Sequence, residues 1–169
     1  MADAAPGGFE PATGDGPPPA HGAAAARARA AEVRTAYEGL LTMRRILAGG
    51  AAAAEGPDAF PVPAPWERQR MPRAVALVLE AAGFAPSALD AAGGRAATGY
   101  RVQPGEGPER VEVSWVGPPG GGAAAAEEER LSEEERLSAC AEVLGRHGWE
   151  CLLYRGPRRR RFLEVEPRR

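Results

Sequence analysis

The glycines and prolines of this chain constrain its fold most, because they separate the few segments that carry large apolar side chains. The 169 residues include 22 Gly and 17 Pro, most of which lie in three stretches, and apolar residues other than Ala are sparse and clustered. Such Gly- and Pro-rich stretches offer little surface to bury. We therefore predict one domain of about 100 residues that carries additional segments, rather than one core built from the whole chain.

The N-terminal third of the chain divides into three segments. Residues 1–22 are rich in Pro, Gly and Ala without periodicity, so we predict that they form a disordered leader. In residues 23–49 apolar side chains recur at three- and four-residue steps, which predicts a helix with one wide apolar face. This helix can pack on the protein's own core or can dock a partner or a second copy. Residues 50–65 are rich in Pro and Ala and form a stiff linker.

Two further helices are predicted within residues 66–166, which we interpret as the core domain. One begins at Pro72, a residue type favoured in the first helical turn, and ends at Gly83. The other begins at Ser132, which has the capping-box spacing with Glu135, and ends at Gly148. Both helices finish on the same frame of Val-Leu, three residues, Gly and an aromatic residue, which suggests an internal repeat.

A hairpin is predicted after each of these two helices. The first has strands at residues 100–103 and 110–116, and the second has strands at residues 149–154 and 161–165. Two helix-strand-strand units predict an α+β fold, with a four-stranded antiparallel sheet that carries both helices on one face. The N-terminal helix is added to this core. Residues 85–98 and 117–130 are then expected to be connecting loops, the second of them flexible.

Strand alternation in the second hairpin predicts one open sheet face. If Trp149, Cys151 and Leu153 face the helices, the even-numbered residues between them lie on the opposite face, and Phe162 joins them from the facing strand. An exposed apolar patch of this kind usually marks a contact surface, and a homodimer is its commonest use in soluble proteins. The candidate interaction face consists of Val116, Leu152, Tyr154 and Phe162.

The same hairpin carries a cluster of arginines that suggests an alternative partner. Arginine binds phosphate through a bidentate fork, and the neighbouring aromatic residues could stack on the bases of single-stranded nucleic acid. The candidate nucleic-acid contacts are Arg155, Arg158, Arg159, Arg160 and Arg161.

Two observations weaken a nucleic-acid interpretation of this cluster. All 21 basic residues are Arg and none is Lys, a bias typical of GC-rich genomes, so a run of arginines is less informative here. Residues 125–150 also have a net charge of −5 and residues 151–169 a net charge of +5. The two segments could therefore pair within one molecule or across a dimer, or the basic hairpin could contact another protein.

No catalytic, cofactor or metal motif stands out in the sequence. Cys140, His147 and Cys151 offer three soft ligands within 12 residues, but structural zinc usually needs a fourth, and none lies nearby. The N-terminus has no secretory signal, and no apolar run approaches the length of a membrane span. We predict a small, non-enzymatic cytoplasmic interaction or adaptor protein without cofactors, which self-associates through the open sheet face or the N-terminal helix. The alternative is a nucleic-acid-binding accessory protein.

Overall fold

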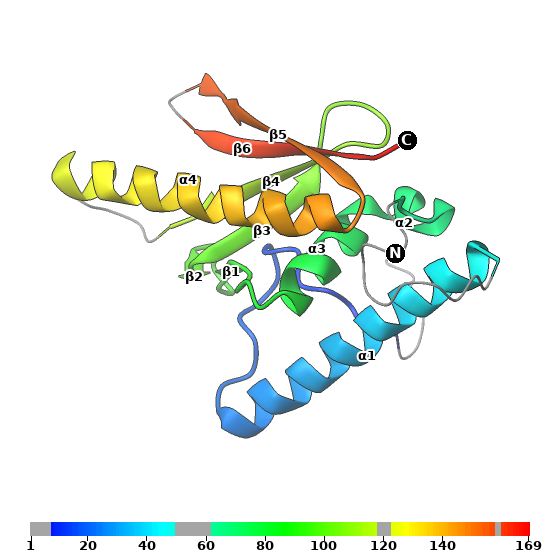
Figure 1. Cartoon of the computed structure of the whole chain (residues 1–169). Coiled ribbons are helices and arrows are strands. Elements are labelled where there is room, and N and C mark those ends of the chain that lie inside the picture. The colour runs from blue at the N-terminus through cyan, green and yellow to red at the C-terminus, as the bar shows by residue number, and fades with distance from the viewer. Residues whose placement is uncertain (1–7, 50–61, 118–122, 158–159) are drawn as a thin grey trace.

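The computed structural model describes residues 8–49, 62–117, 123–157 and 160–169, and leaves the side chains of residues 123–131 undescribed. These residues form four helices and six strands, which are labelled in Figure 1. The helices are α1 (Ala23–Leu47), α2 (Pro65–Gln69), α3 (Met71–Ala81) and α4 (Ala123–Arg146). The strands are β1 (Ala88–Leu89), β2 (Arg95–Ala97), β3 (Gly99–Pro104), β4 (Val111–Val116), β5 (Trp149–Arg155) and β6 (Arg161–Pro167).

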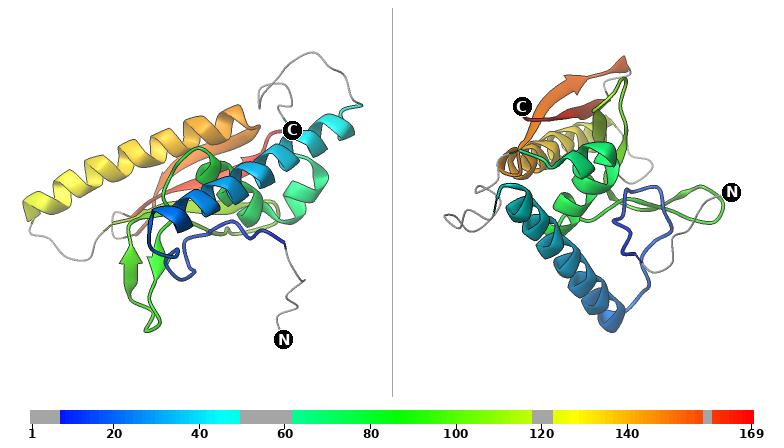
Figure 2. Two further views of the ribbon diagram at one scale, coloured as in Figure 1. Left: turned by 90° about the horizontal axis from the view of Figure 1, so that it is seen from below. Right: turned by 90° about the vertical axis from the view of Figure 1, so that its right-hand side faces the viewer.

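The main sheet has four antiparallel strands in the order β3-β4-β6-β5. Each hairpin supplies two neighbouring strands, and β4 and β6 join the hairpins at the centre of the sheet. Helices α3 and α4 cover one face of this sheet (Figures 1 and 2). The predicted α+β class is thus confirmed, together with the antiparallel sheet that has its helices on one face.

Alternating side chains of the sheet build the core against α3 and α4. Val111 and Val113 on β4 lie opposite Val165 and Leu163 on β6, and all four are buried. Trp149 at the start of β5 is also fully buried. The helices contribute the remaining large apolar residues, which include Val75, Val78 and Leu79 from α3 and Leu137, Cys140 and Leu144 from α4.

Helix α1 packs on the protein's own core. Its residues Val33 and Leu40 form a second buried cluster with Leu77 of α3. Figure 2 shows α1 on the side of α3 that faces away from the sheet. Because α1 covers this side, α3 can be apolar almost all round. The face of the sheet opposite the helices is left uncovered by α1.

Three regions differ most from the sequence predictions. Helix α4 begins at Ala123 and not at Ser132, because Ala and Glu are strong helix formers and extend the helix through most of the predicted loop. The remainder of that loop, residues 118–122, lies outside the described residues. Short strands β1 and β2 pair within the predicted loop at residues 85–98. Helix α2 begins at Pro65, the last residue of the predicted linker, most of which lies outside the described residues.

The predicted disordered leader covers residues 1–22, of which the first seven lie outside the described residues. Within the described part of this segment, residues 12–15 contact the sheet along β3. The Val102 amide donates to the Thr13 carbonyl at 2.7 Å, and the Tyr100 hydroxyl donates to the Ala12 carbonyl at 2.8 Å. In both contacts the segment supplies a backbone carbonyl, which needs no apolar periodicity. Composition alone therefore does not reveal that this part of the segment packs on the sheet.

Candidate interaction surface

The strongly exposed large apolar side chains of the described residues form two groups. Each is at least 40% exposed, which is unusual for residues of this size in an otherwise packed structure. The first group is Met43, Ile46 and Leu47 at the end of α1, with Val62, and the second is Leu152, Leu153 and Tyr154 on β5.

The group on β5 results from the position of this strand at the edge of the sheet. Strand β5 pairs with β6 over seven residues, and among the described residues no strand pairs with its other side. The register places Tyr154 opposite Phe162, and their rings stack with centroids 5.8 Å apart and an interplanar angle of 18°. Leu152 lies on the same face, opposite Glu164. The structure thus brings together three of the four residues of the candidate interaction face.

Val116, the fourth residue, lies elsewhere on the sheet. It ends β4, where it pairs with Gly99 of β3, and it is half-buried. Strand β6 separates β4 from β5, so Val116 is two strands away from Leu152 and Tyr154. The strand order decides this separation, and that order was not predictable from the pattern of each hairpin alone.

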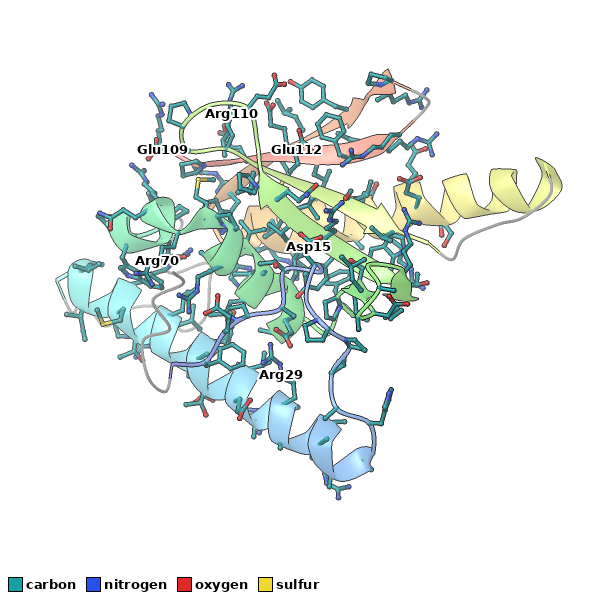
Figure 3. The ribbon with its side chains drawn as sticks, turned by 180° about the vertical axis from the view of Figure 1, so that it is seen from behind. Asp15, Arg29, Arg70, Glu109, Arg110 and Glu112 are labelled. Carbon is teal, nitrogen blue, oxygen red and sulfur yellow. The ribbon has the colours of Figure 1, made fainter. Side chains whose placement is uncertain are left out.

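Charged pairs lie on the same open sheet face as the Tyr154–Phe162 ring pair. Arg110 lies 2.5 Å from Glu166 through Nε and 3.7 Å from Glu164 through Nη1. Glu112 lies opposite Glu164 across the β4–β6 ladder. It forms an ion pair with Arg160, with 3.7 Å between the two charged groups. Figure 3 shows Arg110 and Glu112 projecting beside β6. An apolar centre with a rim of paired charges has the anatomy of a protein contact surface.

The structure places the predicted nucleic-acid contacts in different surroundings. Arg155 is exposed at the end of β5, opposite Arg161 of β6. Arg161 forms an ion pair with Glu134 of α4 at 3.0 Å, and Arg160 pairs with Glu112. Arg158 and Arg159 lie outside the described residues. Two of the three described arginines therefore already contact carboxylates of the same chain, one of them in the acidic segment.

A buried polar network that sequence reasoning missed fixes α1 against α2 and against the turn between α4 and β5. The Arg44 guanidinium of α1 donates to both carboxylate oxygens of Glu67 on α2, and its Nη1 donates to the His147 carbonyl at 2.9 Å. The Tyr37 hydroxyl and His147 Nε2 are hydrogen-bonded at 2.7 Å. No sequence motif marks this network, because its members are separated by up to 110 residues.

The two cysteines lie in apolar surroundings. Desolvation by burial is the main cause that raises the pKa of both Cys140 and Cys151 to about 12, so neither thiol is activated as a nucleophile. His147 is hydrogen-bonded to Tyr37 and, through Nδ1, to the Val143 carbonyl at 2.7 Å. Within the described part of the chain, no three His, Cys, Asp or Glu residues are grouped so that they could hold a metal ion.

The described residues also form an open cavity of about 320 Å³ between the N-terminal segment, α1, α2 and α3. Its walls are mainly apolar, with Leu40, Trp66 and Leu77 among them. Arg73 at its rim already contacts Glu10 at 2.7 Å and the Phe9 carbonyl at 3.2 Å. The cavity therefore offers a place for a small apolar group but no arrangement of reactive side chains.

Comparison of the chain with protein-family models, with curated proteins and with solved structures finds no match. None of the helices in the described residues combines the length and the apolar character that crossing a membrane requires.

Proposed function

We propose that this is a small non-enzymatic interaction protein that self-associates through β5 and the Tyr154–Phe162 ring pair. The exposure of three consecutive apolar residues, Leu152, Leu153 and Tyr154, is the observation that carries the proposal. A strand that only bordered a monomer would gain from polar residues at these positions, because exposed apolar area favours association.

The surroundings of this group support a contact with protein. The stacked rings provide aromatic area, which is enriched at the centres of interfaces, and the Arg110–Glu166 pair supplies a charged rim. The raised pKa of both thiols and the apolar surroundings of Cys140 support a structural role for the cysteines rather than a catalytic one.

The test compares two pairs of substitutions that remove exposed apolar area from different places. Leu152→Ser with Tyr154→Ser changes β5, and Ile46→Ser with Leu47→Ser changes the end of α1. All four side chains are at least 43% exposed, so both variants should fold, as circular dichroism would verify. We expect sedimentation velocity to show weaker self-association for the β5 variant only. Loss of association in the α1 variant alone would indicate that the contact surface lies at the end of α1 and not on β5.

Nucleic-acid binding through the arginine cluster is the alternative, and it has less support. Arg160 and Arg161 are partly neutralised by Glu112 and Glu134. The open face beside the ring pair also carries Glu164 and Glu166, which would repel phosphate. Arg155 retains an exposed position from which it could contact a phosphate.

A further inference from the structure

We propose that β5 pairs antiparallel with β5 of a second copy about a two-fold axis perpendicular to the sheet. The two four-stranded sheets then form one continuous sheet of eight strands. This inference rests on the proposed function, and it specifies both the partner and the geometry of contact. Three observations support it: β5 has exposed apolar residues on both faces, its outer backbone edge is open, and the nearby charges are complementary.

The exposed apolar residues of β5 are consecutive in the chain and therefore lie on both faces of the sheet. Leu152 and Tyr154 point to the open face, whereas Leu153 pairs with the buried Leu163 and points to the face that carries the helices. A partner docked on the open face would leave Leu153 exposed, at 40%. A strand added along the edge of β5 would contact all three side chains.

The outer edge of β5 is open, whereas the other edge of the sheet is occupied. Along β3, the Val102 amide donates to the Thr13 carbonyl and the Tyr100 amide to the Ala85 carbonyl. In the described residues, the only backbone hydrogen bonds of residues 149–155 are those of the ladder with β6. Strand β5 also lacks the proline, the bulge or the short length with which proteins usually protect an edge.

A second copy of the chain fits this edge because β5 is complementary to itself. Directly opposed residues in an antiparallel pair share a face, so a two-fold axis can place Leu153 opposite Leu153 of the second copy. Leu152 then lies opposite Tyr154 of the second copy, and the reverse pair forms on the other side of the axis. Every exposed apolar residue of β5 gains an apolar partner in this register.

The charges around β5 also favour a second copy. In the same register, Glu150 falls opposite Gly156 and Arg155 falls opposite Cys151, so no like charges face each other. Arg155 lies on the sheet face that α4 covers, and α4 exposes Glu135 and Glu142. Arg155 of one copy thus approaches α4 of the other copy. The net charges of +5 for residues 151–169 and −5 for residues 125–150 favour this approach.

The experiment uses single cysteines as reporters of the register in the full-length chain. Leu153→Cys is made in a Cys151→Ala background, which removes the neighbouring thiol from the edge. Directly opposed residues of an antiparallel pair have Cα atoms about 4.5–5.5 Å apart, within the range for a disulfide. We expect oxidation to convert Leu153→Cys into a covalent dimer, seen on a non-reducing gel. Tyr154→Cys and Ile46→Cys in the same background serve as controls and should cross-link much less.

The outcomes separate the inference from the proposed function. Cross-linking of Tyr154→Cys without Leu153→Cys would indicate contact between open faces, which overturns the edge pairing and leaves self-association intact. A wild-type chain that stays monomeric at all concentrations, with no cross-link at either position, would overturn both.

A charged substitution provides a second and independent readout. We expect Leu153→Lys to remain folded, because the side chain is already 40% exposed, and to sediment as a monomer. A folded Leu153→Lys variant that remained a dimer would overturn the pairing.

Discussion

Arg44 on α1 and Glu67 on α2 form a buried bidentate ion pair, with Nε and Nη2 of Arg44 at 2.7 and 2.6 Å from the two carboxylate oxygens. Arg44 is 3% exposed and Glu67 is fully buried. Glu67 also accepts a hydrogen bond from the Ala64 amide at 2.8 Å. The pair therefore connects α1 to the segment that enters the core, in a place where water cannot replace either partner.

Removal of one member of this pair should destabilise the protein strongly. We expect Arg44→Met to lower the free energy of unfolding by about 3–5 kcal/mol, because the Glu67 carboxylate would remain buried without its cation. Urea denaturation monitored by circular dichroism measures this change. Arg73→Met is the matched control, because its ion pair with Glu10 is solvent-accessible, and it should cost less than about 1 kcal/mol. Equal effects of the two substitutions would contradict the buried role of Arg44.

The thiols of Cys140 and Cys151 should react slowly while the protein is folded. Burial raises the pKa of each from 9.0 to about 12, so the reactive thiolate at pH 8 becomes roughly a thousandfold rarer than in the unfolded chain. We expect alkylation by iodoacetamide at pH 8 to be slow for the native protein and rapid in denaturant. Rapid labelling of the native protein would show that the thiols are more accessible than this structure has them.

The same shifts determine how stability changes at alkaline pH. The folded state holds both thiols protonated above the pKa that they have in the unfolded chain. Their contribution is therefore complete below pH 9 and is lost as pH rises from 9 toward about 12. Desolvation also raises the pKa of the Tyr100 hydroxyl, which acts in the same direction. The free energy of unfolding should consequently fall across this interval, as denaturant titrations at several pH values would measure.

Gly14 should be the residue of the N-terminal segment that is most sensitive to substitution. Its φ is +95°, and a Cβ atom there would lie 2.5 Å from the Tyr100 carbonyl oxygen and 2.7 Å from Ser87 Oγ. We expect Gly14→Ala to detach the segment from β3 and to speed amide exchange at Val102. Gly16→Ala is the control, because no atom lies within 4 Å of its added Cβ. Equal exchange in the two variants would mean that Gly14 is not needed for this contact.

The nucleic-acid alternative predicts a specific dependence on salt. If the chain binds through protein contacts, single- and double-stranded DNA should show no appreciable binding near physiological ionic strength of about 150 mM. Fluorescence anisotropy over a range of salt concentrations tests this expectation. Binding that weakens with salt, and that is lost when Arg155 and residues 158–161 are changed to Ser, would favour the alternative.

The elements that local patterns determine were predictable from the sequence. The alternation of residues 111–116 and the frame that ends in Gly148 and Trp149 predict the hairpins and the helix ends. Strand alternation also predicts that Tyr154 and Phe162 share one sheet face, where their rings stack. The predicted start of α4 at Ser132 is wrong, because the Ala- and Glu-rich residues before it have a high helix propensity and continue the helix past the capping pattern.

Contacts between distant parts of the chain were beyond sequence reasoning. The central β4–β6 pairing separates Val116 from β5, and no local pattern specifies which hairpin edges meet. Arg44 and Glu67 lie in separate segments of the sequence, and in each segment the charged residue resembles one on a solvent-exposed surface. The contact of Thr13 with β3 depends on a backbone carbonyl, which every residue possesses and no composition distinguishes.

The contacts along the outer edge of β3 bear on how many copies could join in the proposed pairing. A sheet with two open edges can add strands at both ends and grow into a filament. Here the edge of β3 is covered, because the Val102 amide donates to the Thr13 carbonyl and the Tyr100 amide donates to the Ala85 carbonyl, so the proposed pairing at β5 would close after two copies. If the chain pairs at β5 as proposed, these contacts along β3 would act as a terminator of polymerisation.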